Sequence, residues 1–168
     1  NRDAQVLVPA WVATALVAVR EDRREEAIGI IEELDRETEV SLDWYRENFL
    51  ADLVRVCTAS GALALARRLI DHSRATAKRH HLSLLSATAS LEEGLGHYAD
   101  AAGLYERAVV GWKDYDHQLE TGIGLLGASR CLRRLGDPRS PDRRSRAEEI
   151  FAGLQAQPAV GETTSDPR

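Results

Sequence analysis

The stretch that decides the fold reads Leu95-Gly96-His97-Tyr98-Ala99-Asp100-Ala101-Ala102-Gly103-Leu104-Tyr105-Glu106-Arg107-Ala108. Gly96 can adopt the backbone conformation of a tight reversal. Ala101, Tyr105 and Ala108 then follow at steps of four and three residues, which places them on one face of a helix. The stretch therefore predicts a tight turn that leads into an amphipathic helix.

The same arrangement recurs three more times along the chain. The further copies pair a turn residue with an alanine: Asp22 with Ala27, Gly61 with Ala66, and Gly136 with Ala147 after a longer loop. From the first copy to the last, the four alanines lie 39, 35 and 46 residues apart. Recurrence at such spacing is the mark of a protein built from repeated helix pairs.

The helix before each turn carries a second recurring pattern. A large apolar residue stands at one fixed position: Trp11, Leu50, Leu85 and Leu125. Four residues later stand Ala15, Val54, Ala89 and Ser129. Three of these four are small, as close packing of two helices requires.

These patterns resemble the tetratricopeptide repeat (TPR), which has a W-x2-L-G-x2-Y pattern in its first helix and a period of about 34 residues. Trp11 matches the tryptophan, and Ala101, Tyr105 and Ala108 match the A-x3-F-x2-A signature of the second helix. Thr14 departs from the family leucine, and the closing proline of the family is missing. The resemblance implies an all-α fold of about eight helices, with antiparallel helix pairs stacked into a right-handed superhelix.

We expect one domain over residues 1–156, followed by a flexible tail over 157–168. The four helix pairs are expected at 4–36, 43–79, 82–113 and 117–156. The individual helices are expected near 4–20, 24–36, 43–60, 62–79, 82–95, 98–113, 117–135 and 143–156. Pro138 and Pro141 should keep the last two helices apart.

Composition narrows the class of protein. A net charge of -5 argues against direct binding of nucleic acid, which normally needs a basic surface. The longest apolar run, residues 6–19, is too short to span a membrane. Cys57 and Cys131 have no Cys-x-x-Cys spacing, so a reducing cytoplasm is expected. The lack of methionine and the start at Asn1 suggest a piece of a longer polypeptide.

A second, shorter resemblance concerns the parent protein. The last 75 or so residues, with an Arg-rich linker and a helix around Ala147, are similar to the C-terminal part of large bacterial ATP-binding regulators. Such proteins join a nucleotide-hydrolysing switch, sometimes with a cyclase or DNA-binding domain, to a helical-repeat sensor arm. The strong bias towards arginine over lysine would suit a GC-rich bacterial genome.

Motifs that could carry chemistry are weak. Gly122, Gly124 and Gly127 spell GxGxxG, but the residues before them are polar and do not form the buried strand that a dinucleotide site needs. We expect these glycines to permit close helix packing, and we expect no cofactor. The five histidines lack metal-ligand spacing, and no nucleophile motif is present, so neither a metal site nor enzyme activity is predicted.

The basic segment from Arg130 to Arg146 allows two interpretations. Seven arginines fall between Arg130 and Arg146. They could keep a linker soluble, or they could bind an acidic peptide or a neighbouring domain.

The expected function is protein–protein interaction without catalysis, in the sensor or regulatory arm of a larger bacterial signalling protein. The ligand would be a protein, a peptide or a neighbouring domain of the parent chain, lying in the groove along the first helices of the pairs. The side chains predicted to face this groove are Asn48, Arg55, Ser86, Ser90, Glu93, Arg130 and Arg133. The alternative is a self-assembly module whose end repeats pair to form a homodimer.

Overall fold

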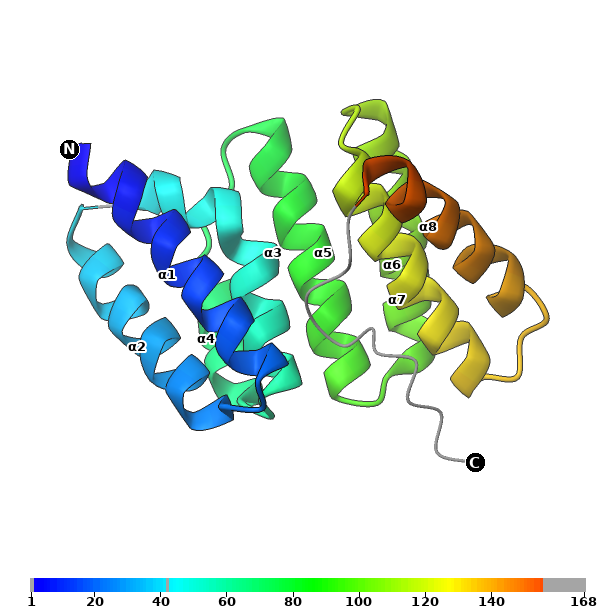
Figure 1. Cartoon of the computed structure of the whole chain (residues 1–168), viewed down its shortest axis with the longest axis horizontal. Coiled ribbons are helices and arrows are strands. Elements are labelled where there is room, and N and C mark those ends of the chain that lie inside the picture. The colour runs from blue at the N-terminus through cyan, green and yellow to red at the C-terminus, as the bar shows by residue number, and fades with distance from the viewer. Residues whose placement is uncertain (1, 42, 156–168) are drawn as a thin grey trace.

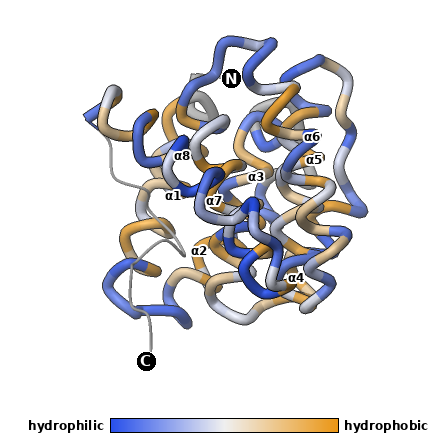
Figure 2. Tube along the Cα trace, turned by 90° about the vertical axis from the view of Figure 1, so that its right-hand side faces the viewer, coloured by the Kyte–Doolittle hydropathy of each residue, from blue (hydrophilic) through white to orange (hydrophobic). Residues whose placement is uncertain are grey.

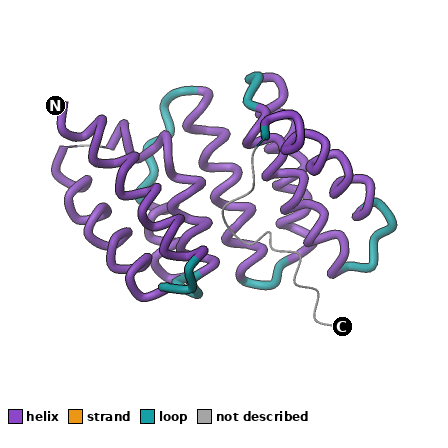
Figure 3. Tube along the Cα trace, viewed as in Figure 1, coloured by secondary structure: helices purple, strands orange, loops and turns teal. Residues whose placement is uncertain are grey.

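The computed structural model describes residues 2–41 and 43–155, with side chains for 6–37 and 46–155. The described part contains eight helices: α1 (Arg2–Arg20), α2 (Arg24–Ser41), α3 (Asp43–Ala59), α4 (Leu63–Asp71), α5 (Lys78–Gly94), α6 (Tyr98–Asp114), α7 (Gln118–Arg134) and α8 (Ser140–Leu154). These residues form no strand (Figure 3). The prediction of an all-α fold is therefore confirmed.

The helices form an antiparallel stack (Figure 1). Each helix packs against the next one, and contacts also link α1 to α3, α3 to α5 and α5 to α7. The four odd-numbered helices therefore stand in a row. This arrangement is compatible with a helical-repeat fold. Hydrophilic residues gather at many of the connections between helices, as Figure 2 shows.

Five tight turns share one backbone geometry. Each has a residue in the left-handed region: Asp22, Gly61, Gly96, Asp116 and Gly136. At Gly61, the N–H bonds to the carbonyl of Thr58 at 3.1 Å, and the next N–H, of Ala62, bonds to Cys57 at 2.8 Å. The same pair of bonds recurs in the other four turns. It is the Schellman motif, which satisfies the last carbonyls of a helix.

The aligned apolar positions form the core. The alanines that anchor the second helix of each pair, Ala27, Ala66, Ala101 and Ala147, are completely buried. In the first helices, Leu50 and Leu125 are buried, while Trp11 and Leu85 are partly buried. The positions four residues later, Ala15, Val54, Ala89 and Ser129, are all buried. The repeated pattern in the sequence therefore corresponds to repeated packing in space.

The prediction of one helix over 62–79 is wrong. α4 ends at Asp71, and α5 begins at Lys78 instead of near residue 82. A connection over 72–77 separates the two helices.

Two buried residues of α3 explain why α4 stops early. Arg46 donates through Nη2 to the carbonyl of His72 at 2.8 Å. The carboxylate of Glu47 accepts from the hydroxyl of Ser73 at 2.6 Å and from the backbone N–H of Arg74 at 3.0 Å. These bonds satisfy backbone groups that a longer helix would otherwise pair, so side chains of α3 fix the end of α4.

The start of α8 also differs from the prediction. The helix begins at Ser140, not near 143, and Pro141 lies inside its first turn. A proline is tolerated there because the first N–H groups of a helix have no partner within the helix. The predicted tail over 157–168 lies outside the described residues.

The three glycines of the GxGxxG motif lie inside α7, not at the end of a strand. A Cβ on Gly127 would lie 2.4 Å from the ring of Tyr105 on α6. On Gly122 it would lie 2.9 Å from the ring of Phe151 on α8. The interpretation that these glycines allow close helix packing is therefore confirmed.

Replacing Gly127 by alanine should separate close packing from helix propensity. We expect Gly127→Ala to lower the free energy of unfolding by about 1–3 kcal/mol, because the ring of Tyr105 must move. Gly103→Ala on α6 is the matched control, since nothing lies within 4 Å of its new Cβ. It should raise the free energy by about 0.5–1 kcal/mol. Urea unfolding followed by circular dichroism measures both, and equal effects would contradict the packing argument.

Candidate interaction surface

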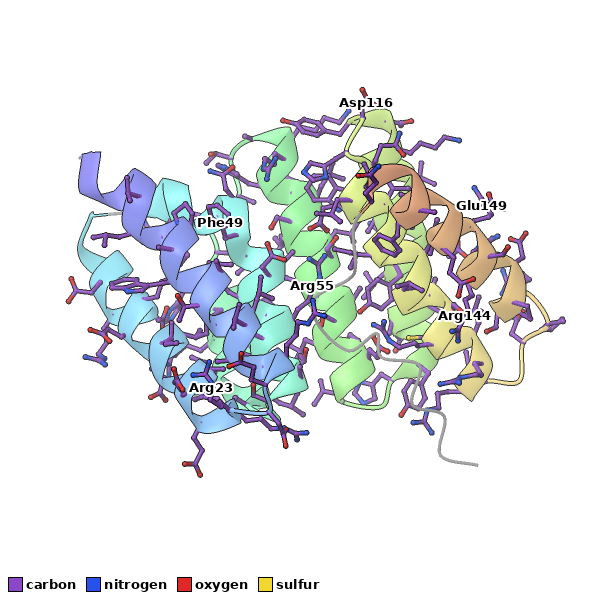
Figure 4. The ribbon with its side chains drawn as sticks, viewed as in Figure 1. Arg23, Phe49, Arg55, Asp116, Arg144 and Glu149 are labelled. Carbon is purple, nitrogen blue, oxygen red and sulfur yellow. The ribbon has the colours of Figure 1, made fainter. Side chains whose placement is uncertain are left out.

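A buried ion pair joins two helices that are not consecutive in the row. Arg55 of α3 donates to Glu120 of α7 through Nη1 at 2.9 Å and Nη2 at 2.5 Å. Arg55 is 9% exposed and Glu120 is 8% exposed. Figure 4 shows Arg55 near the middle of the molecule, in front of α5. A bidentate guanidinium–carboxylate pair fixes the orientation as well as the distance of its two partners.

A second carboxylate shares the same guanidinium. Asp52 accepts from Nη1 of Arg55 at 2.9 Å. Burial favours a higher pKa for both acids, but Arg55 outweighs it at Glu120, whose pKa is lowered. The pKa of Asp52 is raised by burial and also by Glu120, although Arg55 opposes this. Glu120 therefore holds its charge more strongly than Asp52 does.

Further polar contacts join neighbouring odd-numbered helices at equivalent positions. The hydroxyl of Thr58 on α3 lies 3.0 Å from that of Ser90 on α5. Glu93 on α5 accepts from Arg130 on α7 at 2.7 and 2.8 Å. In both cases the first residue stands three positions before its turn glycine and the second stands six positions before the next one. A polar ladder therefore runs from helix to helix, and Tyr105 adds a bond to Glu93 at 2.8 Å.

The structure places the seven predicted groove residues in different environments. Arg55, Ser86 and Ser90 are buried; Asn48, Glu93 and Arg130 are half-buried; and Arg133 is exposed. Ser86 accepts a bond from the indole N–H of Trp112 on α6 at 2.9 Å, inside a helix pair. Arg133 therefore offers the most accessible charge of the seven.

Most arginines of the basic segment already have partners. Arg139 pairs with Asp137, Arg143 with Glu106 and Arg144 with Glu148. The guanidinium of Arg134 lies over the ring of Tyr98, and Arg130 pairs with Glu93. Within the described residues, Arg133 and Arg146 are exposed and form no ion pair with an acid. The paired arginines support the reading of a solvated segment.

Elsewhere in the described residues, side chains that could bind a metal ion do not cluster. Among the described residues, no group of His, Cys, Asp and Glu is placed to hold a metal ion. Burial raises the pKa of the Cys57 and Cys131 thiols to about 12, so both are protonated at neutral pH. None of the described helices is long and apolar enough to cross a membrane.

Comparison of the chain with protein-family models, with curated proteins and with solved structures found no match.

Replacing Glu120 by glutamine should expose the energetic role of the buried pair. We expect Glu120→Gln to lower the free energy of unfolding by about 3 kcal/mol at neutral pH, because Arg55 stays buried with only Asp52 to balance its charge. Glu148→Gln, which removes an exposed partner of Arg144, is the control and should cost about 0.5 kcal/mol or less.

The difference in unfolding free energy between the wild type and Glu120→Gln should depend on pH. The folded-state pKa of Glu120 lies below its ordinary value of 4.5, so its contribution is present above that value and is lost as pH falls through the folded pKa. The gap in unfolding free energy between the wild type and Glu120→Gln should therefore shrink in acid. Urea titrations at a series of pH values measure the gap, and a constant gap would contradict the assignment.

Proposed function

We propose that this chain is a TPR-like interaction module without catalytic activity, acting in the cytoplasm as the sensor or regulatory arm of a larger bacterial signalling protein. The observation that supports this most is the repetition of one helix–turn–helix unit. Its Schellman turns and buried alanines recur through the stack, and its first helices α1, α3, α5 and α7 stand in a row.

A row of equivalent helices is a suitable binding surface. Helical repeats present extended surfaces because each unit adds the same helix face beside the previous one. In this chain the row carries half-buried polar groups that are held in place by their partners, such as Glu93 and Arg130. Side chains already fixed in this way lose little conformational entropy when a ligand binds.

The charges suggest the chemistry of the ligand. Arg133 stands three residues before Gly136, at the position that Glu93 takes in the pair before, but no further odd-numbered helix follows α7 in the described residues. The ladder therefore ends in an exposed guanidinium beside Arg130. A peptide segment or a neighbouring domain with an acidic side chain would complement this end of the row. The chain's net charge of -5 supports a protein ligand over nucleic acid.

Selection of peptides on the purified chain tests the proposal. A displayed library of random peptides is panned on the immobilised protein, and enriched sequences are synthesised and titrated. We expect enriched peptides to share acidic residues and to lose at least about tenfold in affinity on Arg133→Glu, a change of roughly 1.4 kcal/mol.

Arg107→Glu is the matched control, because Arg107 is also exposed but lies on the even-numbered helix α6. It should leave peptide affinity unchanged. The proposal fails if no peptide is enriched, or if both variants weaken binding equally.

A further inference from the structure

The outer side of α1 is apolar and uncovered. Val6 is 69% exposed, Leu7 45% and Val17 48%, and Ala10 and Ala13 are exposed as well. Val6, Ala10, Ala13 and Val17 follow at steps of four, three and four residues, so they form one line along the helix. We call these four residues the α1 stripe. Contiguous exposed apolar residues of this kind mark an interaction surface.

Equivalent positions on α5 and α7 are covered. The α1 stripe stands 16, 12, 9 and 5 residues before the left-handed turn residue Asp22. The same offsets from Gly96 give His80, Leu84, Ala87 and Leu91 on α5, and from Gly136 they give Glu120, Gly124, Gly127 and Cys131 on α7. Seven of these eight residues are buried, and Leu84 is partly buried.

The cover comes from the preceding helix pair. Ala87 and Leu91 of α5 belong to a core cluster with Leu50 and Leu53 of α3. On α7, a Cβ at Gly127 would meet Tyr105 of α6. The α1 stripe is therefore the side of a first helix against which another helix packs elsewhere in this stack.

The opposite end of the stack cannot supply that helix. α8 exposes Arg144, Glu148 and Glu149, and Figure 4 labels Arg144 and Glu149 on this helix. Packing this charged side on the α1 stripe would bury charges against valine and alanine, which is unfavourable. Head-to-tail assembly in which α8 packs on the α1 stripe is therefore disfavoured.

The order of residues in the α1 stripe favours a second copy in a two-fold arrangement. The pattern Val-x3-Ala-x2-Ala-x3-Val reads the same in both directions. When two copies of α1 lie antiparallel, Val6 faces Val17 of the second copy, and Ala10 faces Ala13 of the second copy. The small residues then meet at the centre, where the helix axes approach most closely. A two-fold interface requires this kind of self-complementarity.

We propose that two copies of this chain form a two-fold symmetric dimer in which the α1 stripes pack antiparallel. This goes beyond the proposed function, because it uses a different surface and assigns the second copy as the partner. Arg133 lies on α7, away from α1 in the stack, so dimerisation through α1 leaves the α7 end of the row open (Figure 1). Failure of either proposal leaves the other unaffected.

Mass measurement by light scattering after gel filtration tests the dimer. An interface made by one helix face buries less area than the roughly 1,600 Å² of a standard interface. The dimer is therefore expected to be weak, and the chain is measured at concentrations up to about 1 mM. The wild type should reach twice its chain mass of 18.6 kDa. Ala13→Glu and Val17→Glu should each give 18.6 kDa at every concentration while keeping the helical circular dichroism spectrum.

Ala152→Glu is the matched control, since Ala152 is an exposed alanine on the polar helix α8. It should dimerise as the wild type does. A wild type that stays monomeric at the highest concentration overturns the proposal and means that a different segment or protein covers the α1 stripe. A dimer that survives both α1 variants also overturns it.

Disulfide formation tests the antiparallel order. The natural Cys57 and Cys131 are buried, so an introduced surface cysteine reacts selectively. A mixture of Ala10→Cys and Ala13→Cys chains, oxidised in air-saturated buffer with copper phenanthroline, should form the mixed disulfide severalfold more than either homodimer. A parallel pairing would link each variant mainly to itself, and that result would overturn the antiparallel arrangement.

Discussion

Helices can stack in this chain only because their backbones approach closely at particular positions. At Gly127, the ring of Tyr105 fills the space that any side chain would need. Alanine plays the same part in the second helix of each pair, where Ala27, Ala66, Ala101 and Ala147 are completely buried. Low aromatic content fits this architecture, because the stack fills its interior with small side chains and short inter-helix distances.

The fold could largely be predicted from the sequence, because the features that set it are local. A turn residue and an apolar residue eleven positions before it can be found in all four copies by counting along the chain, and an alanine follows five positions after the turn residue in the first three. Helix ends were predicted less well where a distant residue decides them. α4 stops at Asp71 because Arg46 and Glu47 bind the backbone and side chain of the following turn, and no local signal shows this.

The polar network could not be predicted from the sequence, although several of its residues could be placed on a shared helix face. The sequence places Arg55, Ser90, Glu93 and Arg130 on one helix face as candidate groove residues, but it does not show that they bond to one another or to other helices. Asp52, Glu120 and the hydroxyl of Tyr105 were missed. Glu120 stands 16 residues before its turn residue, at the position that Val6 takes in the first pair and His80 in the third. A charged residue at a position that is otherwise apolar or buried was the available signal. Its partner is 65 residues away, and only the folded stack brings the two together.

The ion pair between Arg55 and Glu120 also affects how easily the stack can bend. In an ideal solenoid each unit touches only its neighbours, so stability is a sum of nearest-neighbour terms and the ends can fray independently. Here α3 is tied to α7 across α5, which couples the second pair to the fourth. Bending of the row would have to stretch this tie. The contacts of α3 with α5 and of α5 with α7, together with the ion pair between α3 and α7, therefore form a closed loop in the middle of the molecule.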